Sequence, residues 1–414
     1  MLRRFFASDR LWIFSAAVFS RVSNFITNVI LARYGGPAVL GTYSATLNTA
    51  SMVVQPVVWS LSTSATLETR SAPDANARRA VTMAHVYWSL LIAGICGIAF
   101  VVLQCGTDIS GDGSVHDALG TLTGLIVIVS MLVTAALQGA LHGTGVYKPV
   151  AARMIGVALV SVMIAVPGVL LLSLAGALAA LSIQYVLMSA ALAHLAKPCA
   201  RERDRVRRAF AAARGQLIRS VPNVVATFIS SGASWLTTIF LVERSHGMAG
   251  VGVFSVGVSW LTIEMIAANA WAGLSLRTIS EAQASSAHDF RLAIRRVLVK
   301  EMAFTSGVAL IVCICAVPLS HLYGMANTPL PAILRLNSLT AIIMTATQAF
   351  ERSMFCSGQQ RSWMRARVIG GLLILGLSGW LLPRGLAYGA LALFAGQAGT
   401  IIVCVVHLWR GRWR

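Results

Sequence analysis

The sequence predicts an all-α polytopic membrane protein, with twelve transmembrane helices arranged as two parallel six-helix repeats around a central cavity. Three observations predict this fold: an apolar composition, twelve long apolar stretches and an internal repeat. Of the 414 residues, 57% are hydrophobic and only 11% are charged, and the mean hydropathy is +0.75. Soluble domains carry about 25% charged residues. The chain therefore lacks the polar surface that a soluble enzyme would need.

Twelve stretches are long and apolar enough to span a membrane, since a helix needs about 20 mostly apolar residues to cross the hydrocarbon. The first six lie near 11–32, 41–66, 80–103, 118–141, 152–173 and 175–196. The second six lie near 217–242, 252–276, 298–320, 331–355, 366–383 and 386–409. Two pairs are single apolar regions interrupted by Pro167-Gly168 and by Pro383-Arg384-Gly385. The first stretch is interpreted as an uncleaved span rather than a signal peptide.

The basic residues indicate the orientation of these spans. The formal net charge is +19, and 28 of the 33 Lys and Arg residues fall in loops on one side of the predicted membrane. Such an asymmetry predicts an even number of spans with both termini in the cytoplasm. The loop 105–117 has three Asp and no Lys or Arg, which fits the outer side. Because the basic residues lie in short runs between apolar stretches, they indicate topology and not nucleic-acid binding.

An offset of 211 residues aligns 31–44 (LARYGGPAVLGTYS) with 242–255 (VERSHGMAGVGVFS). The matched pairs include Arg33 with Arg244, Gly36 with Gly247, Gly41 with Gly252, Ser23 with Ser234 and Thr27 with Thr238. An even number of helices per unit makes the two halves parallel repeats about an axis along the membrane normal. We therefore expect an N-terminal six-helix bundle (1–196), a basic cytoplasmic linker (197–216) and a C-terminal six-helix bundle (217–414).

The segment LARYGGPAVLGTYS, in which a first helix ends and a second begins, resembles the N-terminus of polysaccharide flippases of the O-antigen type. These belong to the multidrug/oligosaccharidyl-lipid/polysaccharide (MOP) exporter superfamily. The resemblance implies a flippase that moves undecaprenyl-diphosphate-linked oligosaccharide from the cytoplasmic to the periplasmic leaflet of the bacterial inner membrane by alternating access. It implies the lipid-linked glycan, membrane lipids, and the polysaccharide polymerase and chain-length machinery as partners.

Arg21 is the clearest functional candidate, because a charge near the middle of the membrane costs at least about 2.5–3.5 kcal/mol and is usually retained for function. Asn24 and Asn28 follow at three and seven residues and share its helix face. This face could bind a diphosphate through charge-assisted hydrogen bonds. The alternatives are a structural ion pair with a neighbouring helix and an arginine that snorkels towards the interface.

Glu264 is the acid that the sequence places deepest in an apolar span. On a continuous helix, Trp260 and Trp271 would share its face at −4 and +7. A carboxylate beside indoles suits sugar recognition through hydroxyl hydrogen bonds and ring stacking. Glu264 could instead act as a proton-coupling group, or neutralise Arg21 from a facing helix.

Further polar residues fall on two other helix faces. Ser44, Asn48, Ser51 and Gln55 form one polar face of the second span, which we expect to line either the cavity or a helix contact. His142 and Arg352 lie at matching positions near the cytoplasmic ends of the fourth and tenth spans. They could gather substrate phosphates at the cytoplasmic mouth, or snorkel to the interface.

The sequence contains no catalytic, nucleotide-binding or metal-binding motif, so we expect a transporter that is not an enzyme and needs no cofactor. Two alternatives remain open. A cation-coupled multidrug exporter of the same superfamily would need acidic groups in its spans, and this chain offers few. A membrane polysaccharide polymerase would commonly use large periplasmic loops, which the chain lacks.

Overall fold

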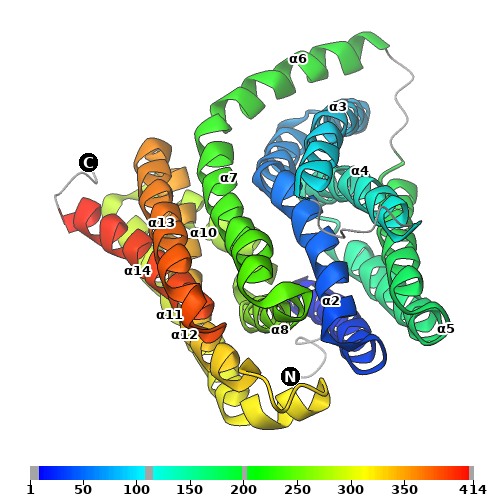
Figure 1. The fold of residues 1–414 in the computed structure, drawn as a ribbon. Coiled ribbons are helices and arrows are strands. Elements are labelled where there is room, and N and C mark those ends of the chain that lie inside the picture. The colour runs from blue at the N-terminus through cyan, green and yellow to red at the C-terminus, as the bar shows by residue number, and fades with distance from the viewer. Residues whose placement is uncertain (1–8, 108–114, 198–202, 410–414) are drawn as a thin grey trace, which may run out of the picture. The chain divides into compact units, whose positions relative to one another are not determined.

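The computed structural model describes residues 9–107, 115–197 and 203–409, and every regular element within these ranges is a helix (Figure 1). Parts of the predicted outer loop (108–114) and linker (198–202) lie outside the described residues. In chain order the elements are α2 (Asp9–Ser71), α3 (Ala75–Thr107), α4 (Val115–Gly143), α5 (Tyr147–Ala196), α6 (Arg203–Arg219), α7 (Val221–Trp235), the π-helix η1 (Leu236–Leu241), α8 (Val242–Glu264), α9 (Ile266–Ala270), α10 (Ala272–Ser285), α11 (Ala287–Leu322), α12 (Leu330–Cys356), α13 (Gln360–Leu381), the 3₁₀ helix η2 (Leu382–Arg384) and α14 (Ala387–Trp409).

These elements supply the twelve predicted spans. In the part of the chain that the structure describes, nine helices are long and apolar enough to cross a membrane. Two of them, α2 and α5, each contain two segments joined at a non-helical residue, Gly36 and Ser173. The remaining segment is α7 with η1, which runs into α8 as far as Gly247. The twelve-helix prediction is therefore confirmed.

The internal repeat is visible in the backbone. Gly36 has φ 82° and Gly247 has φ 66°, the left-handed region that favours glycine, and each interrupts its helix. In the helix before each glycine, a threonine hydroxyl donates to a serine carbonyl: Thr27 to Ser23 at 3.1 Å and Thr238 to Ser234 at 2.9 Å. Both features recur at the offset of 211 residues, although Thr27 lies in an α-helix and Thr238 in the π-helix η1.

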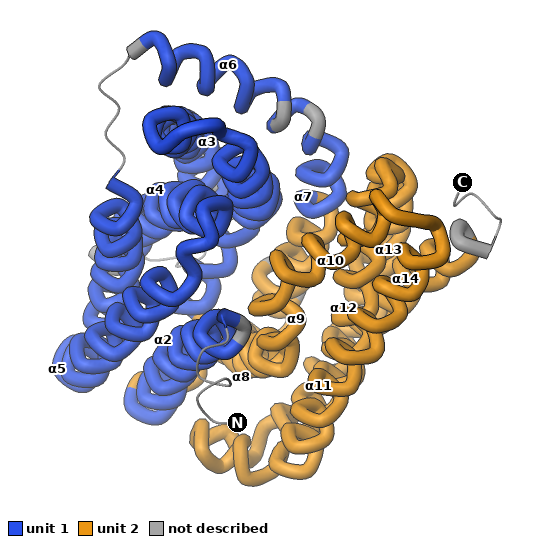
Figure 2. Tube along the Cα trace, turned by 180° about the vertical axis from the view of Figure 1, so that it is seen from behind, with its two compact units in different colours: residues 1–34, 42–228 blue, residues 35–41, 229–414 orange. Residues whose placement is uncertain are grey.

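The chain separates into two compact units (Figure 2). Unit 1 comprises residues 1–34 and 42–228, and unit 2 comprises residues 35–41 and 229–414. The predicted linker region forms helix α6, which belongs to unit 1. The Trp88 indole of α3 stacks on Phe210 of α6 at a ring-centroid distance of 4.4 Å, and its Nε1 donates to the Phe210 carbonyl at 3.0 Å. The segment between the two repeats therefore contains a helix, α6, that packs on α3.

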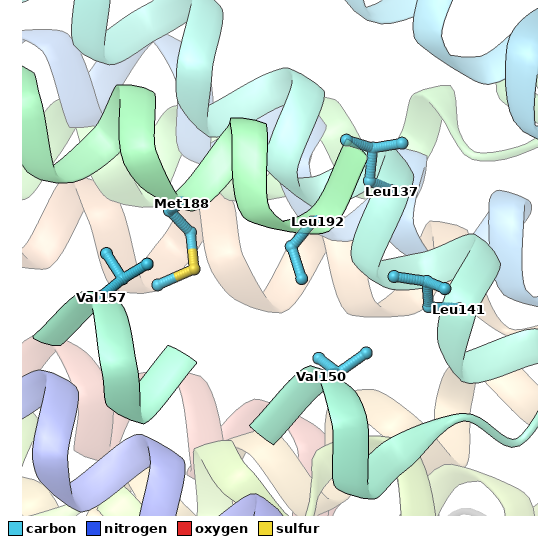
Figure 3. Packing of buried hydrophobic residues seen from close by; sticks show 6 residues of the cluster. All are labelled: Leu137, Leu141, Val150, Val157, Met188 and Leu192. Carbon is cyan, nitrogen blue, oxygen red and sulfur yellow. The ribbon is translucent and has the colours of Figure 1, made fainter. Parts of the chain in front are cut away.

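Unit 1 has a core where α5 folds back on itself beside α4. Val150 and Val157 from one arm of α5 lie close to Met188 and Leu192 from the other arm (Figure 3). The turn lies at Ser173 (φ 49°, ψ −120°), whereas the sequence placed the interruption at Pro167-Gly168, which the structure keeps inside the helix. The glycine serves packing instead, because a Cβ on Gly168 would lie 3.2 Å from the carbonyl oxygen of Gly176 on the other arm.

Residues 35–41 belong to unit 2 because they pack closely on α8. A Cβ on Gly41 would overlap the carbonyl oxygen of Met248, and a Cβ on Gly252 would overlap the carbonyl oxygen of Pro37. Gly41 and Gly252 are repeat equivalents, as are Pro37 and Met248. The two matching loops therefore cross through a reciprocal glycine contact, in which each backbone fills the space of the other's missing side chain.

Candidate functional site

Arg21 lies in the first segment of α2 with Asn24 and Asn28, and all three side chains are half-buried. The guanidinium interacts electrostatically with the phenol of Tyr185 on α5, which also interacts with buried Tyr43. Among the described residues of unit 1, no carboxylate forms an ion pair with Arg21. Its positive charge is therefore available to an anionic ligand.

The polar face of the second α2 segment runs from buried to exposed. Ser44 is buried, Asn48 is half-buried and Gln55 is exposed. The exposure of Gln55 leaves this end of the face uncovered within unit 1. The face as a whole remains a predicted binding surface.

Glu264 ends α8 in unit 2 and is fully buried. One carboxylate oxygen accepts a hydrogen bond from Ser338 Oγ of α12 at 2.9 Å, and the other has no hydrogen-bond partner among the described residues. Asn337, next to Ser338, is also fully buried, and neither atom of its amide is hydrogen-bonded in the described structure. Buried polar atoms are normally satisfied. This group can therefore bind a cation, a proton or a hydroxyl.

The two tryptophans predicted to share a face with Glu264 lie against a different helix. Trp271 packs edge-on against Phe304 of α11 at 5.7 Å, and Trp260 lies beside Tyr323 at the end of α11. The prediction assumed a continuous helix over 252–276. The structure interrupts it at Met265 (ψ 10°) and Trp271 (ψ 1°), which flank the short α9. The break lies between Glu264, which faces α12, and Trp271, whereas Trp260 precedes it on α8 and contacts the end of α11.

Arg352 is buried and ion-paired, not open at a cytoplasmic mouth as the sequence suggested. Its Nη1 donates to both carboxylate oxygens of Glu301 at 2.7 and 2.8 Å. Its Nη2 donates to the carbonyl of Ala268 in α9 at 2.8 Å and to Gln348 at 3.2 Å. Ser275 Oγ donates to the same Glu301 carboxylate at 2.6 Å. The guanidinium thus fixes the interrupted helix to α11 and α12.

Two acidic residues in polar networks were not predicted from the sequence. Glu301 lies three residues into the predicted 298–320 span and is as deeply buried as Glu264, so Glu264 is not alone. Glu68 lies at the end of α2 beside Ser64 and His85. Ser64 and Ser275 are 211 residues apart, and each contacts an acid, but Glu68 and Glu301 do not match at this offset, so the repeat alone would not have identified them.

His142 at the end of α4 is half-buried, and its ring lies 5.2 Å from that of Tyr147. The structure gives it a local aromatic contact. Its role in gathering substrate stays a prediction.

No family model and no curated protein sequence matches this chain. Solved structures do match across almost the whole length. An inward-facing multidrug resistance MATE family transporter of the MOP superfamily superposes with a TM-score of 0.75 at 13% identity, covering 97% of this chain and 98% of the other. An outward-facing MATE transporter of the same superfamily gives 0.67 at 12% identity, covering 97% and 96%.

A MOP superfamily transporter from Pyrococcus furiosus, described as having a binding pocket of reverse polarity and a different function, gives 0.64 at 13% identity, covering 97% and 94%. At these identities the likeness establishes the fold. The chain has the twelve-helix fold of MATE and MOP transporters and is a multi-pass membrane protein by its helices.

Proposed function

We propose that this protein is a flippase that moves undecaprenyl-diphosphate-linked oligosaccharide from the cytoplasmic to the periplasmic leaflet by alternating access, for surface polysaccharide synthesis. The resemblance of residues 31–44 to polysaccharide flippases supports the substrate class. The fold shared with inward- and outward-facing MATE transporters supports the transport mechanism.

The observation that carries the proposal is Arg21. A guanidinium inside a predicted span, without a carboxylate partner among the described residues of its own unit, is costly unless it serves a ligand. A diphosphate supplies the missing negative charge and several acceptor oxygens, which suit the planar donor fork of arginine. Asn24 and Asn28 add amide donors on the same face.

The charge balance supports an anionic substrate. The chain has 33 basic and 14 acidic residues. The Pyrococcus furiosus transporter, whose binding pocket is described as having reverse polarity, indicates that this fold serves pockets of different charge. In our proposal Asn48, Gln55, Trp260, Trp271 and Glu264 contact the sugars, while the polyprenyl tail stays in lipid.

The test compares a deletion strain carrying wild type, Arg21→Ala or Arg21→Lys. We expect Arg21→Ala to accumulate complete radiolabelled lipid-linked oligosaccharide in the cytoplasmic leaflet at normal protein levels, and Arg21→Lys to retain partial export. The control is Arg335→Ala, because Arg335 is an exposed arginine on α12. Full export by Arg21→Ala would overturn the phosphate-binding role. Translocated but unpolymerised units in the deletion strain would instead support a polymerase.

A cation-coupled multidrug exporter is the second candidate, favoured by the unpartnered atoms of Glu264 and Asn337. That function predicts that the deletion strain becomes sensitive to cationic dyes while glycan export stays normal. Glu264→Gln would then reproduce the dye sensitivity.

A further inference from the structure

We infer that Ser64, Glu68 and His85 form a proton-binding site in unit 1, and that loading and unloading of this site couples transport to a proton gradient. Coupling of this site to transport rests on the proposed transport function. Proton binding rests only on the geometry of the three side chains.

The three side chains form one chain of contacts between α2 and α3. Ser64 Oγ lies 3.3 Å from Glu68 Oε1 and 3.2 Å from His85 Nε2. His85 Nε2 lies 3.9 Å from the other oxygen of Glu68, and His85 Nδ1 lies 3.0 Å from the Val81 carbonyl oxygen. The His85 side chain is fully buried, while that of Glu68 is 13% exposed. Glu68 is therefore the member of the site that water can reach.

The geometry fixes how many protons the site holds. Since Nδ1 of His85 faces a carbonyl, it carries a hydrogen and donates it. The serine hydroxyl has one hydrogen to donate, but it touches two groups that can accept. Both contacts become hydrogen bonds only if a further proton sits on His85 Nε2 or on Glu68. In the first form, imidazolium donates to Ser64 and Ser64 donates to the carboxylate; in the second, Glu68 donates to Ser64 and Ser64 donates to neutral imidazole.

The two forms differ by a shift of protons along the chain and are both electrically neutral. Loss of one proton leaves a carboxylate, a neutral histidine and a single hydroxyl hydrogen. One of the two contacts then joins two acceptors, and a net negative charge remains beside a buried ring, which is unfavourable in a medium of low dielectric constant. The described arrangement is thus that of the proton-loaded site, and we expect release of the proton to change the contacts that Ser64 makes between α2 and α3.

The second repeat provides a built-in comparison. Ser275, the repeat equivalent of Ser64, donates to Glu301, and Glu301 pairs with Arg352. An arginine side chain carries donors only, so this network joins a carboxylate to a permanent cation. His85 in unit 1 can release its proton, because histidine titrates near neutral pH. Unit 1 therefore has a serine-acid network that ends on a titratable histidine, whereas the network in unit 2 ends on an arginine. Beyond the two serines their members are not repeat equivalents, since Ile279 matches Glu68 and Leu90 matches Glu301.

Other charged groups at this end of unit 1 lie on α2, α3, α4 and α6. Arg70, Arg78 and Arg79 are exposed, and Asp74 pairs with Arg205 of α6 at 3.5 Å. His142 of α4 lies against Tyr147. The Lys and Arg distribution assigns this end to the cytoplasm, so the site would exchange protons with cytoplasmic water through Glu68.

Proton binding at this site can be tested on the purified full-length protein. We expect wild type to release roughly one proton per chain from this site as the pH is raised, with loss of the infrared band of a protonated carboxyl or of imidazolium. Glu68→Gln should abolish both signals, because a glutamine amide donates to Ser64 permanently and mimics the loaded form. His85→Gln should move the proton release to lower pH, because the glutamine amide can donate to Ser64 and leave the serine hydrogen to the carboxylate of Glu68. The matched control is Glu281→Gln, since Glu281 is an exposed acid paired with Arg277 on one helix.

Equal proton release by wild type, Glu68→Gln and His85→Gln would overturn the site. A misfolded variant is recognised by its melting temperature, and Ser64→Ala then provides a milder test. That change removes only the bridge, and we expect it to make Glu68 and His85 titrate independently. Unchanged titration in Ser64→Ala would likewise overturn the shared proton.

Coupling of the proton site to glycan translocation can be tested in inverted membrane vesicles that contain lipid-linked glycan. A pH gradient should accelerate glycan translocation several-fold in wild type and in Glu281→Gln, and have no effect in Glu68→Gln. An equal response in Glu68→Gln would overturn coupling at this site. If wild type moves no glycan but its proton release depends on Glu68, the proposed substrate is wrong and the proton site stands.

Discussion

Two arginines of this chain occupy opposite electrostatic settings. Arg352 has its guanidinium hydrogens taken by Glu301, Ala268 and Gln348. Arg21 interacts with a phenol, and no carboxylate of its unit pairs with it among the described residues. Because unfavourable burial of a charge must be offset, the first setting indicates a structural role, and the second is the setting that our proposal assigns to a ligand. Whether a charged residue in a helix has a structural or a functional role therefore becomes clear only once its partner is known.

We predict that Arg352→Gln destabilises the protein by about 3–5 kcal/mol, the usual cost of leaving one charge of a buried pair unpaired. Thermal unfolding in detergent measures the loss. The double variant Glu301→Gln/Arg352→Gln should recover much of it, because neither charge then remains alone. If the two single losses simply add in the double variant, the pair is not coupled and its structural role is wrong.

At the scale of elements, residues 35–41 approach α8 closely through backbone at two glycines. We predict that Gly41→Ala and Gly252→Ala each cost about 1–3 kcal/mol, because the new methyl group overlaps a carbonyl oxygen of the opposite loop. Gly94→Ala on α3 is the control, since a Cβ there has nothing within 4 Å. Melting temperatures in detergent provide the measurement. A loss of stability in Gly94→Ala equal to that in Gly41→Ala would remove the close approach as its cause.

The elements also show which parts of the structure the sequence could predict. Span positions and the turns at Gly36 and Gly247 follow from local composition and from the repeat, so they were predictable. The interruption at Met265 and Trp271 was not, since no proline or glycine marks it. The Arg352–Glu301 pair joins residues 51 positions apart on two helices, and only the packing of α11 on α12 determines such a contact. Helix periodicity places a residue on a face but does not say which neighbour that face meets.

On the scale of the whole molecule, the repeat has kept its backbone and changed its charges. Matching glycines interrupt a helix, and matching threonines donate to a serine carbonyl, in both halves. The serine-acid networks that begin at Ser64 and Ser275 instead end on histidine in one half and arginine in the other. In the proposed coupling mechanism, only unit 1 binds the proton. Only the two serines match at the offset of 211 residues, so the acids and their basic partners lie at different positions of the two halves.

The orientation of the molecule gives the last prediction. The basic residues predict both termini in the cytoplasm, which would place Thr144 between α4 and α5 inside and Asn327 between α11 and α12 outside. Both are exposed, so a cysteine at either position would be accessible from its own side. In a background freed of the natural cysteines, a membrane-impermeant maleimide should label Asn327→Cys in intact cells and Thr144→Cys only after permeabilisation. The reverse pattern would show that the 28 basic residues face outward. Glu68 would then exchange protons with the periplasm, and a gradient would load the site from the opposite side.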